Sequence, residues 1–197
     1  MFRIIPCAAG CGRPAITGSK LCTIHAVNPV TEAARIIESI QNQEVVKDLN
    51  APDLHFDQVD FSKRHFYGCS FKGAFFSGCT FSNVLMRLVF FDRADFVDCK
   101  FIDNDMYFLS FAGSRIQNSV FRRSDLIDVN FGGTLIVDTV FSGNNLYSSR
   151  FIDTDIRNSG FIDCNLTKVY FIKSRQVEVD FEQSNTGEAI YSVEKRP

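Results

Sequence analysis

Three cysteines and one histidine near the N-terminus have the residue types and the spacing of a metal site. They are Cys7, Cys11, Cys22 and His25, in the pattern C-x3-C-x10-C-x2-H. Three thiolates and one imidazole are a ligand set that a tetrahedral structural zinc ion uses. All four ligands would come from the protein, which leaves no position for a reacting water. We therefore predict a structural zinc site and not a catalytic one.

The segment that carries these residues, 1–27, holds few apolar side chains and would hardly fold without a metal. Gly10 and Gly12 flank Cys11 and would let the backbone turn tightly at the ion. The segment resembles short Cys3His zinc-finger modules of the knuckle or treble-clef type, although its first spacer has three residues where two are commoner. Free cysteines or another metal are the alternatives. The module could serve only to stabilise the fold, or it could also bind a partner.

The composition excludes several functional classes. The chain has 197 residues and a net charge of −2, which argues against a general binder of nucleic acid or of anionic membranes. It lacks an apolar run of about 20 residues, which a membrane span needs, and it shows no secretory signal. Its seven cysteines are an odd number and fit a disulfide framework poorly. We expect a reducing, cytoplasmic location.

The sequence offers no arrangement of residues for catalysis. His55 and His65 precede apolar residues and lie in no catalytic motif, and the P-loop, G-x-S-x-G and H-E-x-x-H patterns are absent. The many serines and threonines fall at positions with structural roles. We therefore predict that the protein is not an enzyme.

A ladder of large apolar residues at every fifth position organises the rest of the chain. It runs from Phe56 to Phe181 without a slip in phase, takes up 17 of the 21 phenylalanines and has one polar member, Gln176. A short fixed period indicates stacked repeats. We call each ladder residue the centre of a five-residue unit. The residue two before the centre is small almost throughout, and in extended chain these two side chains point to the same side, so each unit buries both.

The centres that are not phenylalanine alternate, and this sets the length of one coil. Leucine or methionine recurs every 20 residues, and isoleucine recurs every 20 residues with an offset of ten, at Met106, Ile116, Leu126, Ile136, Leu146, Ile156 and Leu166. Leucine stacks on leucine or methionine, and isoleucine on isoleucine, only if one coil contains four units. We therefore predict a four-sided solenoid with 20-residue coils and two interior columns of phenylalanine, with rings about 4.8 Å apart.

This pattern resembles the pentapeptide-repeat family, whose consensus is small–polar–Leu/Phe–x–x. The resemblance implies a mainly β fold, a right-handed quadrilateral β-helix, over residues 53–183. Together with the N-terminal motif, it divides the chain into a zinc-binding module at 1–27, a linker and capping α-helix at 28–52, the β-helix, and a C-terminal cap or dimerisation tail at 184–197.

The same pattern accounts for the remaining cysteines. Cys69, Cys79, Cys99 and Cys164 all fall at the small inward position. We interpret them as core residues and not as ligands. Cys79 and Cys99 share a column one coil apart, but a reducing compartment argues against a disulfide between them.

Residues 28–52 are expected to form a helix that covers the open first coil. Thr31 is a candidate N-cap, and Pro52 would stop the helix. A solenoid exposes apolar side chains and unpaired backbone at its first coil and needs a cap there. The side chains that the helix would bury there are Ile36, Ile37 and Ile40. An amphipathic helix that binds a partner is the alternative.

Two sets of outward residues differ from an ordinary solvated surface. The apolar set is Leu85, Leu88, Phe90, Tyr107 and Phe108. It indicates a contact with a second subunit, with another protein or with the chain's own helix. The acidic set is Asp98, Asp103, Asp105, Asp125, Asp128, Asp138 and Glu178.

Two functional hypotheses follow. The first, which we favour, is a non-catalytic protein-interaction scaffold with a structural zinc site, acting on a protein partner of unknown identity. The second comes from the resemblance, because Qnr-type and mycobacterial fluoroquinolone-resistance members of the family, and related toxin-immunity proteins, are thought to mimic DNA on DNA gyrase, a type II topoisomerase. This chain departs from them in its nearly balanced charge, its lack of projecting loops and its zinc-like module. We expect no direct contact with nucleic acid or membrane.

The ladder fails near the C-terminus, where Thr186 occupies the next centre. A short apolar segment, 189–193, follows it. This segment could close the last coil as a strand, or it could join two chains end to end, as in the resistance-type relatives. We predict a homodimer through this end.

Overall fold

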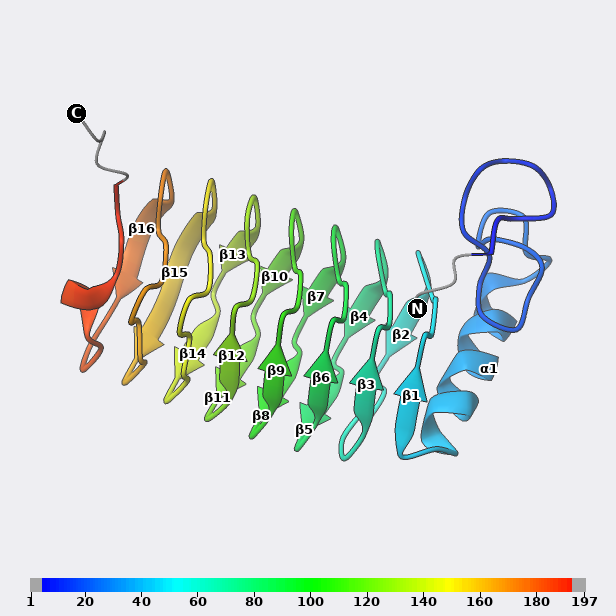
Figure 1. Cartoon of the computed structure of the whole chain (residues 1–197), viewed down its shortest axis with the longest axis horizontal. Helices are drawn as coiled ribbons and strands as arrows, with labels where there is room; N and C mark the ends of the chain where they lie inside the picture. Colours follow the sequence, from blue (N-terminus) through cyan, green and yellow to red (C-terminus); the bar gives the residue numbers. More distant parts are fainter. Residues whose placement is uncertain (1–4, 193–197) are drawn as a thin grey trace.

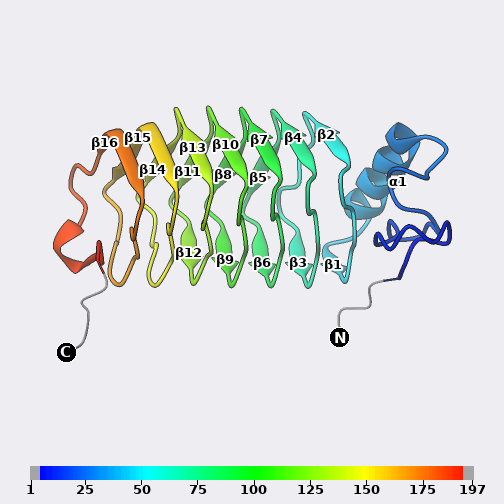
Figure 2. The same cartoon turned by 90° about the horizontal axis from the view of Figure 1, so that it is seen from above.

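The computed structural model describes residues 5–192, and it has the shape of a rod (Figure 1). Flat coils of chain stack along the rod, and their short strands line up from one coil to the next (Figure 2). Helix α1 and the irregular N-terminal segment lie together at one end of the stack, and the C-terminal segment lies at the other. The fold is the predicted β-solenoid with one helix at its N-terminal end.

The described residues form one α-helix, sixteen short strands and one 3-10 helix. Their bounds in chain order are α1 Pro29–Gln41, β1 Val45–Lys47, β2 His55–Asp57, β3 His65–Tyr67, β4 Phe75–Ser77, β5 Thr80–Ser82, β6 Leu85–Arg87, β7 Asp95–Val97, β8 Lys100–Ile102, β9 Asp105–Tyr107, β10 Arg115–Gln117, β11 Val120–Arg122, β12 Asp125–Ile127, β13 Leu135–Val137, β14 Val140–Ser142, β15 Asp155–Ile162, β16 Arg175–Asp180 and η1 Thr186–Glu188.

The strands define the sides of the solenoid, which we number in chain order. The first face carries β1, β3, β6, β9 and β12 as one sheet. The second face has isolated bridges in place of named strands, such as the bridge between Ser70 and Phe90. The third face carries β2, β4, β7, β10 and β13, and the fourth carries β5, β8, β11 and β14. The longer strands β15 and β16 extend over both of these last faces.

Neighbouring strands are parallel, and their register is offset by 20 residues. Phe66 pairs with Met86 on the first face, and Phe121 pairs with Phe141 on the fourth. Four units of five residues therefore make one coil. This register confirms the coil length predicted from the alternation of leucine and isoleucine.

The centres fill the interior in columns of stacked side chains. The rings of Phe101 and Phe121 lie 4.4 Å apart at an interplanar angle of 1°, and those of Phe131 and Phe151 lie 4.6 Å apart at 7°. Adjacent columns meet edge to face, as Phe121 and Phe131 do at 85°. Both arrangements suit the aromatic quadrupole. Every centre from Phe56 to Phe171 is buried, as predicted.

The small inward residues complete the core and bind backbone carbonyls. The Ser114 hydroxyl donates to the carbonyl of Phe91 at 2.7 Å, and the Asn144 amide donates to the carbonyl of Phe121 at 2.8 Å. These bonds satisfy polar groups that would otherwise be buried without partners. The four cysteines at this position are buried and free, which confirms their role as core residues: Cys69, Cys79, Cys99 and Cys164.

The chain turns at the residue two after each centre, and this residue has a positive φ. Glycine adopts this conformation without strain, and aspartate and asparagine tolerate it better than other residues. Such residues stand at many of the bends, and Gly68, Gly73, Asp98, Asn118, Asp138 and Gly143 all have φ between 50° and 67°.

Helix α1 begins one turn earlier than its predicted cap implied. The side chain of Asn28 accepts hydrogen bonds from the amides of Val30 and Thr31, so Asn28 is the N-cap and the prediction of Thr31 was wrong. Asparagine is among the strongest N-cap residues because its side-chain oxygen reaches the free amides of the first turn. Pro29 follows at the first helical position, where the missing N–H costs nothing.

The helix is also shorter than predicted, and it ends at Gln41 instead of near Pro52. The Arg64 guanidinium donates to the carbonyls of Ile40 and Gln41 at 3.2 Å each, which satisfies the end of the helix. The following residues already belong to the solenoid, since β1 pairs with β3. Val46 and Ala51 are buried as the first two centres. The ladder thus begins before Phe56. Its first two centres, Val46 and Ala51, are smaller than the later ones and therefore do not stand out in the sequence.

Helix α1 covers the first coil as expected. It contacts β2, and its apolar face joins the continuous core of the solenoid. Its fully buried residues are Ala33, Ile36 and Ile40, with Ile37 partly buried against the same core.

The N-terminal segment closes the same end on the second face. The Thr17 amide donates to the carbonyl of Asn50 at 2.8 Å, and the Thr17 hydroxyl accepts from the amide of Asn50 at 2.7 Å. Two successive coils are joined in the same way: the Ala51 amide donates to the carbonyl of Ser70, and the Ser70 amide donates to the carbonyl of Leu49. Thr17 therefore takes the place that a preceding coil would occupy.

The C-terminal segment closes the last coil on the same face. The Ile190 amide donates to Val169, and the carbonyl of Ile190 accepts from Phe171, both at 2.8 Å. Tyr191 stacks on Phe171 with ring centroids 5.6 Å apart. The end of the predicted tail, residues 193–197, lies outside the described residues.

Candidate metal centre and surface sites

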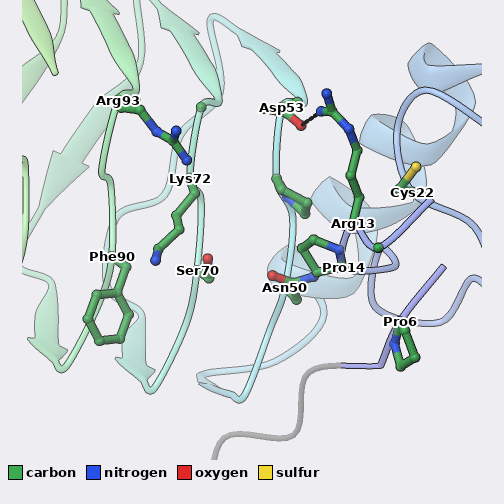
Figure 3. A pocket seen from close by; sticks show the side chains of 13 residues that line it. Pro6, Arg13, Pro14, Cys22, Asn50, Asp53, Ser70, Lys72, Phe90 and Arg93 are labelled. Atoms are coloured by element: carbon green, nitrogen blue, oxygen red, sulfur yellow. Dashed lines mark ion pairs between the residues drawn. The ribbon is translucent and has the colours of Figure 1, made fainter. Parts of the chain in front are cut away.

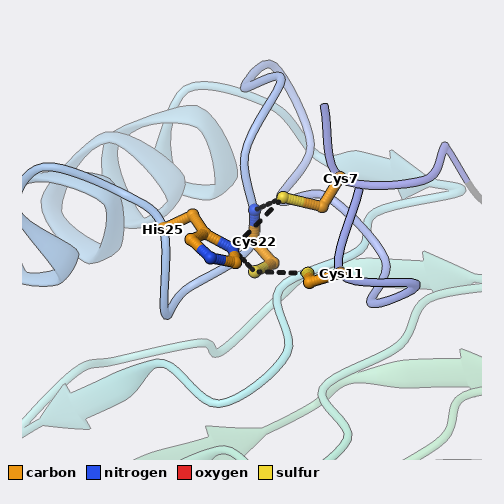
Figure 4. A group of neighbouring side chains, drawn as sticks. All are labelled: Cys7, Cys11, Cys22 and His25. Atoms are coloured by element: carbon orange, nitrogen blue, oxygen red, sulfur yellow. Dashed lines mark hydrogen bonds between the residues drawn. The ribbon is translucent and has the colours of Figure 1, made fainter. Parts of the chain in front are cut away.

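The ligand atoms of the four predicted metal-binding residues lie within 4.8 Å of one another (Figure 4). The Cys11 and Cys22 sulfurs are 3.7 Å apart, and His25 Nδ1 lies 3.4 Å from the Cys22 sulfur and 3.6 Å from the Cys7 sulfur. A tetrahedron with metal–sulfur bonds of about 2.3 Å and metal–nitrogen bonds of about 2.05 Å has edges of about 3.75 and 3.55 Å. The three short distances agree with such a tetrahedron, so the cluster could hold a metal ion.

Two short segments position the ligands. A bridge between Pro6 and Pro14 closes the loop that carries the first two cysteines, and the Cys7 amide donates to Arg13 at 2.8 Å. Gly10 and Gly12 have φ of 73° and 74°, as the predicted tight turn requires. The other two ligands lie on one turn, where the His25 amide donates to the carbonyl of Cys22 at 3.0 Å. Cys7 and Cys22 are buried, whereas Cys11 and His25 are exposed.

Two of the three thiols, Cys7 and Cys22, have lowered pKa values, which favour the thiolate form that a metal requires, whereas the pKa of Cys11 is raised. Burial opposes ionisation of Cys22, but hydrogen bonds with His25, Cys11 and Cys7 outweigh it and lower the pKa of this thiol from 9.0 to about 6. The Cys22 amide donates to the Cys7 sulfur at 3.3 Å and lowers the pKa of Cys7. The side chain of Cys22 raises the pKa of His25.

The apolar set gathers along the edge between the first and second faces. Leu88 and Phe108 are 55% and 54% exposed and occupy the same bend position one coil apart. Leu85, Phe90 and Tyr107 are half-buried beside them. Helix α1 lies over the first coil and leaves both bend residues uncovered, so the chain's own helix is not the partner of this edge.

Leu88 and Phe108 also carry backbone strain. Their φ values are 55° and 59°, a conformation that costs a residue with a branched or bulky side chain roughly 1–2 kcal/mol. In the same column Gly68 and Asp128 occupy the bend with residues that tolerate it. Two large apolar side chains, each about half exposed, thus occupy bends whose backbone conformation glycine and aspartate adopt with less strain.

Cations lie close to the apolar edge. The Arg87 guanidinium lies 3.8 Å from the centre of the Tyr107 ring, and the Tyr107 hydroxyl donates to Asp125 at 3.2 Å. Burial and the Asp125 carboxylate raise the pKa of this hydroxyl. The Lys72 ammonium lies 5.5 Å from the centre of the Phe90 ring. These contacts make the edge amphipathic.

The acidic set does not form one continuous face. Asp98 and Asp138 lie on the edge between the third and fourth faces, where they accept hydrogen bonds from the Asn118 and Asn158 amides of the next coil. Glu178 occupies the same column. The asparagines separate the carboxylates along this column.

The other acidic residues lie elsewhere on the surface. Asp103, Asp105 and Asp125 meet around a shallow depression of about 320 Å³ that also contains Arg123. Arg123 binds both oxygens of Asp103, at 2.7 and 2.8 Å, and its hydrogen bonds lower the pKa of that carboxyl. Asp128 lies at a bend between the first and second faces, away from this group.

A groove of about 1160 Å³ lies between the N-terminal segment and the second face (Figure 3). Its cationic side chains are Arg13, Lys72 and Arg93. No motif in the sequence indicates this groove. The 20-residue columns bring the two solenoid cations to the same face, but only the docking of the N-terminal segment turns that face into a groove.

The remaining histidines form no site. His55 is exposed and its ring lies 5.5 Å from that of Phe75, and His65 is half-buried. The described residues contain one metal-sized group of three or more His, Cys, Asp or Glu side chains, the Cys3His cluster. Within residues 5–192, no helix has the length and the apolar character of a membrane span.

The profile described as pentapeptide repeats matches eight copies within the chain, over residues 53–83, 105–143 and 124–161. Similar solved structures include a trypsin-treated QnrB1, a plasmid-mediated fluoroquinolone resistance protein, with 16% identity, 75% of this chain and 89% of that chain covered, and a TM-score of 0.48. A pentapeptide repeat protein from the Arabidopsis thaliana thylakoid lumen has 12% identity, coverage of 64% and 68%, and a TM-score of 0.32. HetL, a protein of heterocyst differentiation regulation from the cyanobacterium Nostoc, has 10% identity, coverage of 82% and 96%, and a TM-score of 0.24. No curated protein sequence matches the chain.

Proposed function

Because the repeat domain of this chain belongs to the pentapeptide-repeat family, we propose that the protein is a non-catalytic scaffold that binds another protein through its outer surface. The observation that supports this most is the exposed apolar edge at Leu88 and Phe108. The centres fill the interior of the solenoid, so a ligand or partner can bind only at its outer faces and its two ends. Strained, exposed apolar residues are typical of a contact site.

We also propose that the N-terminal module holds a structural zinc ion on Cys7, Cys11, Cys22 and His25. The donor set of three sulfurs and one imidazole nitrogen supports zinc over harder ions, and the three short distances between ligand atoms are compatible with it. Elemental analysis of the purified protein should give one zinc per chain. The Cys22→Ser variant should lose it, while Cys99→Ser, at a core cysteine, should keep it. A protein purified without metal, or with another metal at full occupancy, would overturn this assignment.

Site-specific photo-crosslinking tests the scaffold. A benzoylphenylalanine at position 108 should capture one defined protein in cells, and the same probe at Arg122, on the fourth face, should not. Phe108 and Arg122 are both exposed, so the probes differ in their surroundings and not in access. Equal capture at the two positions, or none at either, would contradict a binding edge at Leu88 and Phe108.

The alternative function is that of a DNA mimic that modulates a type II topoisomerase such as gyrase. The paired and dispersed acidic residues favour the scaffold over this alternative, because a mimic of DNA needs a continuous negative face. A supercoiling assay with gyrase, with and without a topoisomerase poison, decides the matter. Protection of gyrase at micromolar protein would replace our proposal with the alternative.

We further propose a cytoplasmic location and a homodimer through the C-terminal end. Free buried cysteines support a reducing compartment. Tyr191 is 46% exposed at the last coil and offers an apolar surface for end-to-end contact. Light scattering at micromolar concentration should give twice the chain mass, and a monomeric mass would remove the dimer.

A further inference from the structure

The groove between the N-terminal module and the second face combines positive charge with an apolar rim. Its floor is formed by the second face of the first three coils, and its wall is formed by the module (Figure 3). We propose that this groove binds an acidic segment of the partner protein, in which apolar side chains flank the carboxylates. This inference rests on the proposed scaffold function and names the chemistry of the partner.

Arg93 is the residue that recognises a carboxylate in this proposal. It occupies a bend, and its neighbours in the same column are Gly73 and Gly113, so no side chain lies beside it in either adjacent coil. Among the described residues, its guanidinium has no ion pair. Arg123 occupies the equivalent position on another edge, and there Asp103 binds it with two hydrogen bonds. The solenoid neutralises one bend arginine and leaves the other open to a ligand.

The other two cations each face one carboxylate. Arg13 lies 3.6 Å from Asp53, and both side chains are about half exposed. Lys72 lies 3.7 Å from Asp92 and also faces the Phe90 ring. The Arg13–Asp53 pair is exposed, so it contributes little and exchanges readily for a ligand carboxylate. Lys72 instead stays beside the buried Asp92 Oδ2, which accepts no hydrogen bond among the described residues. The three cations exceed the two acids, although the whole chain carries a net charge of −2, so the groove is locally positive.

Apolar contact comes from the rim. Phe90 lines the groove, and it lies two residues from Leu88, whose side chain is exposed on the adjoining edge. Phe108 continues that edge in the next coil. The groove and the apolar edge thus form one path, on which carboxylates would meet Arg93 and apolar side chains would meet Leu88 and Phe108.

The backbone of the second face offers no edge for an added strand. The amides of Ala51, Phe71 and Phe91 donate to the next coil at 2.7–2.8 Å. The wall presents Pro6 and Pro14, which have no N–H. Recognition therefore depends on side chains and not on strand addition.

The same features disfavour a nucleic acid as the ligand. The positive surface is short and Asp53 lies within it, so successive phosphates would meet a carboxylate. The Phe90 ring faces Lys72, which leaves it less available for stacking on a base. A protein segment with separated charges fits this surface better than a uniform polyanion.

Selection of peptides on the intact, metal-loaded protein tests the proposal. A phage library of random peptides should yield sequences rich in Asp and Glu with interspersed Leu or Phe. The strongest peptide is then labelled with fluorescein, and its affinity is measured by anisotropy. Arg93→Glu should weaken binding about tenfold or more, since a charge-assisted contact becomes a repulsion. Arg122→Glu makes the same charge change on the fourth face and should leave the affinity unchanged.

The outcomes that would contradict the groove proposal can also be stated in advance. Basic or neutral peptides, no enrichment, or equal binding by the Arg93→Glu and Arg122→Glu variants would overturn the proposal. Tighter binding of a fluorescein-labelled single-stranded DNA of similar length, lost in Arg93→Glu, would assign the groove to nucleic acid instead. If the probe at position 108 still captures a partner while Arg93→Glu binds peptide normally, the groove proposal fails and the scaffold stands. If the probe captures nothing, the scaffold itself fails.

Discussion

In the repeat domain every centre from Phe56 to Phe171 is buried against its equivalent one coil away, whereas the N-terminal module buries only Cys7, Ala15, Ile16 and Cys22 among its described residues. The repeat domain is stabilised by many similar contacts, each supported by its neighbours. In the module four side chains that could hold a metal converge at one point, and we propose that its fold depends on them. A substitution in the repeat domain should therefore disturb only the neighbouring coils. Loss of one ligand in the N-terminal module should unfold the whole module.

Loss of the metal cluster should have the largest effect. Cys22→Ser removes a ligand, and metal binding in small zinc modules contributes about 10–16 kcal/mol, so the module should unfold. Hydrogen exchange at Ile16 and Thr17 should become fast, and exchange at Asn50 should follow, because Thr17 binds it. The central coils should stay protected.

Cys99→Ser is the matched control for this change. Its column contains Ser119 and Ser159 at the equivalent positions, so serine should fit with little loss. If chelation or Cys22→Ser unfolded all coils together, the two regions would form a single cooperative unit, and the comparison above would fail.

A deletion in the central core should rank second. Phe121→Ala removes a ring that stacks between Phe101 and Phe141, and such a cavity costs about 3–5 kcal/mol. Phe181→Ala, at the partly exposed end of the same column, should cost clearly less. Urea unfolding measures both. Equal losses would show that position along the rod does not matter.

The strained apolar edge should give a smaller effect of opposite sign. Phe108→Gly relieves an unfavourable φ, offset partly by the greater freedom of the unfolded chain, and should raise the free energy of unfolding by about 0.5–1 kcal/mol. Asp128→Gly, in the same column, should gain less because aspartate tolerates this conformation. A loss of stability in Phe108→Gly would mean that the ring is held by packing and not for a partner.

The smallest effect concerns a surface ion pair. Arg123 lowers the pKa of Asp103, so the pair stabilises the folded protein above the ordinary carboxyl range, and this contribution disappears as the pH falls through the lower folded-state pKa. Arg123→Ala should therefore lower the thermal midpoint slightly at neutral pH and not at strongly acidic pH. Arg93→Ala should show no such pH dependence, since Arg93 has no carboxylate partner among the described residues.

Much of this molecule followed from local pattern. The five-residue period, the alternation of leucine and isoleucine, and the small inward residues predicted the coil, the columns and the buried cysteines. The spacing of Cys7, Cys11, Cys22 and His25 predicted the cluster, because ligands close in sequence need only short turns to meet. The start of the ladder was hidden because Val46 and Ala51 are small, and Pro52 resembled a helix stop.

What the sequence determined, then, is the interior, since side chains that repeat at a fixed period must stack on their equivalents. What only the tertiary structure decided is the surface. Asp103 and Arg123 are 20 residues apart and could be placed together from the register, but the groove joins Arg13 of the module to Arg93 of the third coil through an irregular contact. No period in the sequence encodes that contact. It results from hydrogen bonds such as that of Thr17 to Asn50, which depend on how the N-terminal segment fits against the first coil.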